Sequence, residues 1–423
     1  MHKFLLTIAA LLACVAAFAA DPTATDYTFD QCQGSLQPYP RNVALVATPD
    51  SLTPVYISHV GRHGSRYPAG SGHALRLQRT LRHADSLGTI TDLGHRLLTL
   101  VDRVVNDSKG RWGALDSLGQ SEQRAIAGRM MANYPEVFTD GTVNALSSYS
   151  PRSMMSMFSF VHQMDRLNNK LTFLTSTGRM NSALMRPFDV DEDYIKFRED
   201  NTIGPVYNKY FEEVCPLPAI TRVLGRDYPF GDTEKAREIA IIEYYVVAGL
   251  EAMQIPSQMD VYFTRAEANA FWSCFNLRQY LQHTASTVSA IPADIAAQLV
   301  IDIIQKTDTA ITGQNPAVAD LRFGHAETVM PLASLIRLPG CYYLTNYFDT
   351  VASHWRDFYV VPMAANVQFV LFKAKKSGNY YLRVALNEVP VPLLPNSKSV
   401  IIPWSAARNY LMECVPMHMS LAL

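Results

Sequence analysis

Residues 55–87 form the segment that most constrains the fold of this 423-residue chain, because strand, loop and helix signals follow one another without a gap. Val55 to Ser58 is a short apolar run typical of a buried strand, and Gly61 to Pro68 is a turn marked by glycine and proline. Ala74 to Leu87 then has the apolar spacing of a helix. Because α/β sheets present anion sites on such loops, we expect an α/β fold with an anion site in this loop.

The order of the remaining signals indicates one domain interrupted by another. Strand signals lie near both ends of the chain, and residues between them are mostly helical in pattern. We therefore expect an α/β core domain with a central, mostly parallel sheet flanked by helices, and an inserted, mainly α-helical domain. The predicted α/β domain comprises residues 21–155 and 316–423, and the predicted helical domain comprises 156–315.

Two helix starts in the middle of the chain have clear capping signals. Asp232 stands where it can cap a helix that runs to Val247. Thr264 and Glu267 have the spacing of a capping box, in which each satisfies a backbone group of the other. Both helices are therefore predicted to begin at these residues.

The first twenty residues predict an exported protein. Lys3 precedes an apolar stretch that is too short to span a membrane comfortably, and Ala17-Phe18-Ala19 has the pattern of a cleavage site. Residues 1–20 are therefore predicted to be a signal peptide, and the protein periplasmic or secreted. An alternative is a lipoprotein box at Leu11–Cys14, in which lipidated Cys14 would anchor the protein to the outer membrane. No later apolar run predicts a transmembrane span in the mature chain.

Charge and cysteine usage exclude several kinds of site. The 37 basic and 38 acidic residues nearly cancel, so no overall positive field favours nucleic acid. The cysteines after residue 20 are odd in number and show neither a disulfide framework nor a CxxC metal motif. They are Cys32, Cys215, Cys274, Cys341 and Cys414. We expect no metal and no cofactor.

The loop itself, Arg62-His63-Gly64-Ser65-Arg66-Tyr67-Pro68, carries the strongest chemical signal. Guanidinium groups match phosphate oxygens geometrically, and the histidine between the arginines could attack a phosphorus atom that they hold. The arginines would then stabilise the charge that develops on the phosphoryl oxygens. The alternative is a solvated, arginine-rich turn with an incidental histidine.

This RHGxRxP pattern resembles the signature of the histidine phosphatase superfamily, in its acid phosphatase and phytase branch. Two later stretches fit the same resemblance in order. Leu115–Gln123 is similar to the family's L-T-x-x-G-x-x-Q stretch, with Asp116 in place of threonine, and implies a helix that packs behind the site. In Pro151–Ser156 the family places a further phosphate-binding arginine, which would be Arg152 here.

A fourth stretch, His325-Ala326-Glu327, points to one branch of that family. Common acid phosphatases have His-Asp at this position, whereas the HAE variant resembles the multiple inositol polyphosphate phosphatases. The resemblance implies that His63 is the nucleophile, that Glu327 protonates the leaving oxygen, and that the phosphate is bound by Arg62, Arg66, Arg152 and His325. A metal at His325 and Glu327 is the weaker interpretation, because two ligands make no site.

The function implied by this resemblance is an exported phosphomonoesterase that hydrolyses inositol polyphosphates such as phytate through a covalent phosphohistidine. Its partner would be a small phosphorylated molecule. The alternatives are a broad-specificity histidine acid phosphatase for small phosphomonoesters, a transferase similar to phosphoglycerate mutase, and a phosphate-binding protein without turnover. The sequence indicates no oligomeric state.

Several other polar residues are weaker candidates. His59 lies at a strand end and is expected to be a packed histidine. Arg383, Asn387 and Glu388 follow one another near the end of a predicted strand, where the family has a similar N-E stretch. We expect them to support the site without contacting substrate.

Overall fold

The computed structural model describes residues 26–420 of the chain. The predicted signal peptide at 1–20 and the predicted lipidation site at Cys14 lie outside the described residues. No helix within 26–420 has both the length and the apolar character that crossing a bilayer requires. All five cysteines of this part of the chain are unpaired.

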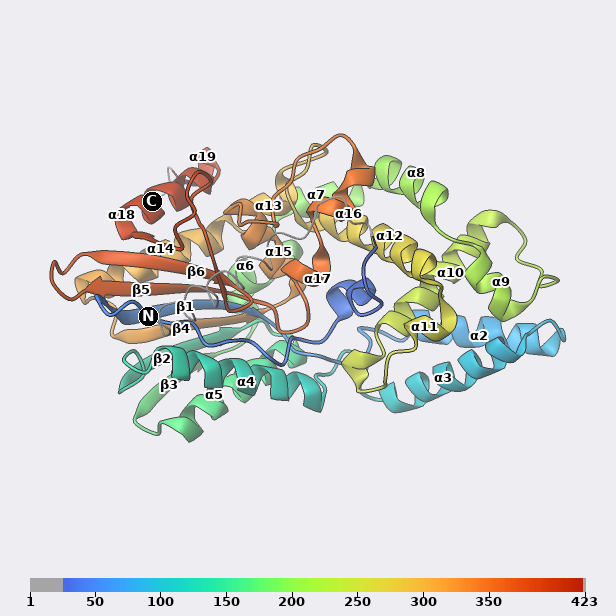
Figure 1. The fold of residues 1–423 in the computed structure, drawn as a ribbon, viewed down its shortest axis with the longest axis horizontal. Helices are drawn as coiled ribbons and strands as arrows, with labels where there is room; N and C mark the ends of the chain where they lie inside the picture. Colours follow the sequence, from blue (N-terminus) through green and yellow to red (C-terminus); the bar gives the residue numbers. More distant parts are fainter. Residues whose placement is uncertain (1–25, 421–423) are drawn as a thin grey trace, which may run out of the picture.

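One mixed sheet forms the centre of the molecule (Figure 1). Its strands are β1 (Leu52–Arg62), β2 (Gly141–Ser147), β3 (Leu171–Ser176), β4 (Ala317–Gly324), β5 (Asn366–Ala374), β6 (Tyr380–Leu386), β7 (Val389–Val391) and β8 (Ile401–Pro403). The order is β3-β2-β4-β1-β5-β6-β7, and β8 pairs with β6. Strands β3, β2, β4 and β1 pair in parallel, whereas all pairings from β5 onward are antiparallel. Because β6 runs in the same direction as β1, five strands share one direction, which confirms the predicted fold class.

Strand β1 lies inside the sheet, and both of its faces are covered. Every residue from Tyr56 to Arg62 is buried, as expected of a strand inside a sheet with helices on both sides. Its neighbours are β4, which is parallel, and β5, which is antiparallel. In the β1–β4 register Arg62 lies opposite Gly324. The loops that follow these two strands therefore begin side by side at one edge of the sheet.

Helices cover both faces of the sheet and also form a separate part of the molecule beside it. The main helices are α2 (Gly72–Ser86), α3 (Asp92–Ser108), α4 (Ser117–Asn133), α5 (Pro151–Leu167), α7 (Glu192–Glu199), α8 (Gly204–Val214), α9 (Pro218–Leu224), α10 (Thr233–Ala248), α12 (Arg265–His283), α14 (Ala297–Thr312), α15 (Ala326–Leu335) and α18 (Trp404–Cys414). The shorter ones are η1 (Gln31–Leu36), α6 (Ser182–Met185), α11 (Met259–Tyr262), α13 (Ile291–Asp294), α16 (Val351–His354), α17 (Asp357–Val360) and α19 (Met417–Ser420). Helices α4 and α5 pack on one face of the sheet, and α14, α15 and α18 lie on the other (Figure 1).

The two predicted capping signals are confirmed. The Asp232 side chain accepts a hydrogen bond from the backbone N–H of Lys235 at the start of α10. Thr264 and Glu267 form the complete capping box at the start of α12. Local chemistry therefore fixed where these helices begin.

The predicted domain ranges differ from the packing of four elements. Helix α5 and strand β3 belong to the sheet layers, although most of their residues fall in the stretch assigned to the helical domain. Helices α2 and α3 fall in the stretch assigned to the α/β domain, yet they pack against α9 and α10 in a separate apolar core. We call α2, α3 and α8–α12 the helical part (Figure 1). The apolar stripe of α2 is buried, as predicted, but a stripe does not specify which element covers it.

Glu243 on α10 is a buried carboxyl group without a hydrogen-bond partner among the described residues. Burial raises its pKa to about 8, against an ordinary value of 4.5. Between these values the folded chain binds more protons than the unfolded chain, so Glu243 lowers stability as the pH rises, by up to about 1.4 kcal/mol per pH unit. We expect Glu243→Gln to match the wild type near pH 4.5 and to be more stable near pH 8. Urea unfolding at both pH values measures this difference, and a pH-independent difference contradicts it.

Candidate active site

Helix α4 supports the loop after β1 through a contact between two glycines. A Cβ on Gly64 would collide with the Gly119 backbone, and a Cβ on Gly119 would collide with the backbone of Ser65. Only glycine at both positions lets the helix and the loop approach this closely. This contact explains Gly119 of the second motif, whose predicted place behind the loop agrees with the structure.

Polar side chains of α4 fix the same loop. The Glu122 carboxylate accepts hydrogen bonds from the backbone N–H and the hydroxyl of Ser65, both at 2.7 Å. Gln123 Nε2 donates to the Arg62 carbonyl at 2.9 Å. On the other side, the Gly64 N–H donates to Ser156 Oγ on α5 at 3.1 Å. The loop conformation is thus set by two helices rather than by the loop residues alone.

Three arginines converge on this loop with buried donors that lack acceptors. The Nε atoms of Arg62, Arg66 and Arg152 are all buried, and none has a hydrogen-bond partner among the described residues. Burial, together with the neighbouring arginines, lowers the pKa of Arg62 to about 10 and that of Arg66 to about 9. Unsatisfied cationic donors at such close quarters favour binding of an anion with several oxygens.

His63 lies among these arginines as a neutral ring with a defined tautomer. Its Nδ1 lies 2.9 Å from the Gly64 carbonyl oxygen, which can only accept, so Nδ1 carries the proton. Nε2 is therefore unprotonated. Burial and the charges of Arg152, Arg62 and Arg66 lower the pKa of His63 well below its ordinary value. The ring is available as a nucleophile over the physiological pH range.

His325 faces His63 from the start of α15, with 5.6 Å between the ring centroids. Its Nδ1 lies 3.3 Å from Arg152 Nη2, and its Nε2 lies 2.8 Å from Arg186 Nη1. Burial and these guanidinium groups lower the pKa of His325 to about 3. The parallel pairing of β1 with β4 brings the two histidines together across a long separation in sequence. We call Arg62, Arg66, Arg152 and His325 the cradle.

Glu327, on the first turn of α15, lines a cavity that lies beside these residues. Burial by itself would raise the pKa of its carboxyl group, but interactions with His283, His325 and Arg62 lower it to about 2. Glu327 is therefore a carboxylate near neutral pH. Among the described residues, it is the one acidic side chain in the wall of the cavity.

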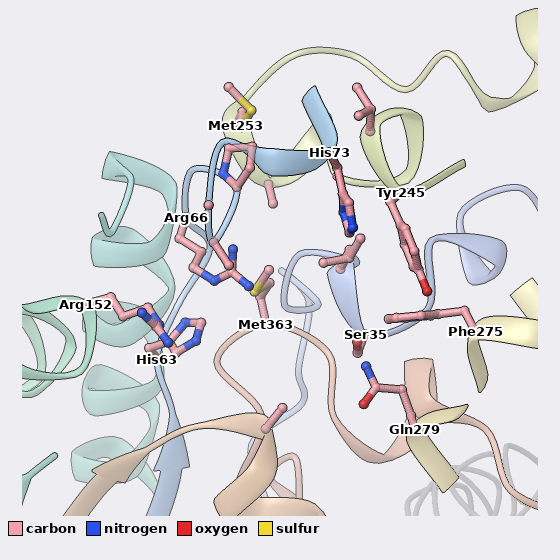
Figure 2. A pocket seen from close by; sticks show the side chains of 18 of the residues that line it. Ser35, His63, Arg66, His73, Arg152, Tyr245, Met253, Phe275, Gln279 and Met363 are labelled. Carbon is pink, nitrogen blue, oxygen red and sulfur yellow. The ribbon is translucent and has the colours of Figure 1, made fainter. Parts of the chain in front are cut away.

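The cavity has a volume of about 520 Å³ and lies between the loop after β1 and the helical part. Figure 2 shows His63, Arg66 and Arg152 on one side, with Tyr245, Phe275 and Gln279 opposite them. Its basic lining residues are Arg62, His63, Arg66, His73, Arg152, Arg278 and His283. Because four of these residues are arginines, the nearly neutral chain concentrates positive charge in this cavity, which net charge could not predict.

Comparison with known proteins finds similar sequences and similar structures. No family model matches the sequence. Multiple inositol polyphosphate phosphatase 1 of Gallus gallus is 23% identical over 381 residues, which cover 87% of this chain and 84% of the relative. The Homo sapiens protein of the same name is 23% identical over 389 residues, which cover 83% of this chain and 77% of the relative.

Solved structures agree with the sequence relatives. The Bifidobacterium longum multiple inositol polyphosphate phosphatase in complex with phosphate superposes with a TM-score of 0.77 at 17% identity, covering 92% of this chain and 99% of the other. The chain has the fold of the multiple inositol polyphosphate phosphatases. The phytase from D. castellii is also similar, with a TM-score of 0.70 at 16% identity over 94% of this chain and 88% of the other. The resemblance to the histidine acid phosphatase and phytase branch is thus confirmed.

Within this phosphatase fold, the structure brings all six predicted site residues to one end of the cavity. Five of them line its wall directly, namely Arg62, His63, Arg66, Arg152 and Glu327. His325 contacts the side chain of Arg152. The weaker candidates lie elsewhere. His59 packs between the rings of Phe160 and Phe323, as expected. The described residues contain no cluster of three or more potential metal ligands.

The predicted supporting residues near the C-terminus do not contact the cradle. Arg383 donates hydrogen bonds to the Ala47 carbonyl and to the Tyr134 hydroxyl. Glu388 accepts two hydrogen bonds from Arg129. These are buried links within the α/β layers, and Arg383 and Glu388 do not line the cavity.

Sequence reasoning missed three basic residues of the site in this phosphatase fold. Arg186 lies beside His325 and packs over the rings of Tyr149 and Phe188. His283 and Arg278 reach the cavity from α12. None of the three belongs to a local motif, because each is brought in by tertiary packing alone.

Proposed function

We propose that the chain is a phosphoric monoester hydrolase that acts on inositol polyphosphates, phytate among them, through a covalent phosphohistidine. The observation that carries this proposal is the neutral His63, with Nε2 unprotonated, among three arginines whose buried Nε donors lack acceptors. The names of the relatives support the substrate class. We also propose export on the signal peptide predicted at residues 1–20, which mass spectrometry of the mature N-terminus tests.

The reaction begins when His63 Nε2 attacks the phosphorus atom. The new N–P bond forms on the side of phosphorus opposite the P–O bond to the inositol, which breaks at the same time. The cradle stabilises the three equatorial oxygens. Glu327 gives a proton to the departing oxygen. Because Glu327 is a carboxylate, it first takes this proton from the phosphate group of a substrate monoanion. The bound phosphate favours this transfer, since it offsets the positive field that lowers the pKa of Glu327. Water then attacks phosphorus, Glu327 takes its proton, and the N–P bond breaks.

A direct test is phosphate release from inositol hexakisphosphate by the purified protein, compared with a simple sugar phosphate. We expect a clear preference for the hexakisphosphate and a defined order of inositol phosphate products. EDTA should leave the rate unchanged, since the arginines supply the positive charge. Equal turnover of both substrates favours the alternative, a broad-specificity acid phosphatase.

A second cavity favours the larger substrate. It has a volume of about 430 Å³ and shares Arg278 and Gln282 with the first. Its wall also contains Arg198, Asn201 and Asn208, and none of the described residues that line it is acidic. Arg278 stands over the Tyr207 ring at 6.0 Å. We propose that this guanidinium binds a phosphate remote from the reacting one.

Arg278→Met should therefore separate large from small substrates. We expect the KM for inositol hexakisphosphate to rise ~10-fold or more, because a charge-assisted hydrogen bond is lost. The kcat/KM for a simple monophosphate should change less than about 2-fold, since that substrate does not reach Arg278. Steady-state kinetics on both substrates measures the split. Arg408→Met, which breaks an ion pair with Asp308 outside both cavities, is the matched control. Equal losses on both substrates contradict the assignment.

A further inference from the structure

We propose that Asp357 is a positioning residue that fixes the Arg62 guanidinium and connects it to the helical part. Asp357 does not line the cavity, so it cannot touch a substrate bound there. The inference rests on the proposed function, because it concerns how Arg62 is held for phosphate binding. Asp357 begins the short helix α17, which lies beside η1 and α12 (Figure 1).

The Asp357 carboxylate joins two segments that are distant in sequence. It is fully buried, and it accepts a hydrogen bond from the Ser35 backbone N–H at 2.7 Å. Its other oxygen accepts one from Trp272 Nε1 on α12 at 2.9 Å. The Asp357 N–H in turn donates to Asn276 Oδ1 on the same helix at 2.8 Å. Helix α12 and the N-terminal segment η1 are therefore linked through this one residue.

Both acceptors of Arg62 Nη1 depend on Asp357. Arg62 Nη1 donates to the carbonyl oxygens of Ser35 and Val361, each at 2.6 Å. The N–H of Ser35 is bound by the Asp357 carboxylate. The N–H of Val361 donates to the Asp357 carbonyl at 2.8 Å. Asp357 thus fixes the backbone N–H of both residues, Ser35 and Val361, whose carbonyl oxygens orient Nη1. The Arg62 Nε, which has no partner among the described residues, stays available.

Gly34 makes the close approach of Asp357 possible. Its φ is +59°, and a Cβ there would lie 2.6 Å from Asp357 Oδ2. A side chain at position 34 would therefore displace the carboxylate from Ser35. This gives a second way to disturb the same link without removing the charge of Asp357.

The test is a double-mutant cycle between Asp357→Asn and Arg62→Lys. An asparagine has one acceptor oxygen, so its amide must face either the Ser35 or the Trp272 donor, and one hydrogen bond is lost. We expect kcat for phosphate monoesters to fall ~10-fold to 100-fold in D357N, with a much smaller change in KM. In the R62K background the same change should cost less than about 3-fold, because Arg62 is then no longer there to be positioned.

The matched control is Asp308→Asn. Asp308 also accepts hydrogen bonds from a tryptophan Nε1, that of Trp404, and from Arg408, both at 2.8 Å, and it lies outside the cavity. We expect normal kcat in this variant. Losses that simply multiply in the cycle, or a folded D357N with wild-type kcat, overturn the inference.

Two further measurements cover the other outcomes. If D357N does not fold, Gly34→Ala replaces it in the cycle, with the same expected loss and the same contradiction. Calorimetric binding of inorganic phosphate separates this inference from the proposed function. If the wild type neither binds inorganic phosphate nor releases it from substrate, the proposed function is wrong. If the wild type does both and D357N has the same phosphate affinity and the same kcat, only the role of Asp357 is wrong.

Discussion

Replacing His63 with alanine should reduce phosphate release from inositol hexakisphosphate by ~10⁴-fold or more, because no other group can form the covalent intermediate. The fold should persist, since His63 is a neutral ring among positive charges and contributes little attraction to its neighbours. Rapid acid quenching with ³²P-labelled substrate measures the intermediate directly. We expect acid-labile, base-stable label on residue 63 of the wild type and none in H63A.

His95→Ala is a suitable control for this variant. His95 is half-exposed on α3 and lies outside the cavity. It should retain normal turnover and normal labelling. Near-normal activity in folded H63A, or label on a different residue, would show that His63 is not the nucleophile.

Replacing Glu327 with glutamine should produce a loss that depends on the leaving group. Glutamine keeps the size of the side chain but has no proton to give, so esters of alkyl alcohols such as inositol should slow by ~10²–10⁴-fold. An aryl phosphate such as p-nitrophenyl phosphate should slow only a few-fold, because its phenolate leaves without protonation. Comparing kcat for the two substrate types measures the difference.

The control for this experiment is Glu238→Gln, which removes an exposed carboxylate that pairs with Arg76 on α2. It should change neither rate. Equal losses in E327Q on both substrate types would assign Glu327 a purely electrostatic or structural role and leave the acid unidentified.

The sequence predicted which residues converge on the cavity, because most of them lie in two short motifs. Arg62, His63 and Arg66 lie within five residues, and His325 and Glu327 lie within three. The neighbours within each group are given by the sequence itself. Helices α4 and α5 then set the conformation of the loop, and the parallel pairing of β1 with β4 brings the two groups together. The capped starts of α10 and α12 were predictable for the same reason, since a cap is satisfied by near neighbours.

The opposite wall of the cavity was not predictable from one sequence. Arg278 and His283 are polar positions on a long helix, and nothing in their neighbourhood distinguishes them from ordinary solvated residues. Likewise the apolar stripe of α2 indicates a buried face but not whether a sheet or another helix covers it. Such choices depend on contacts between residues far apart in the chain, which periodicity does not encode.

The placement of β1 has a consequence for the order in which the protein can fold. Both strands that hydrogen-bond to β1 come from residues 317–374, more than 250 positions downstream. Until that last quarter of the polypeptide has been translated, the segment that carries His63 has no backbone partners on either side. Long-range pairing of this kind is slow to form. Catalytic competence should therefore arise abruptly and late, and nascent chains halted before residue 317 should be inert and sensitive to proteases.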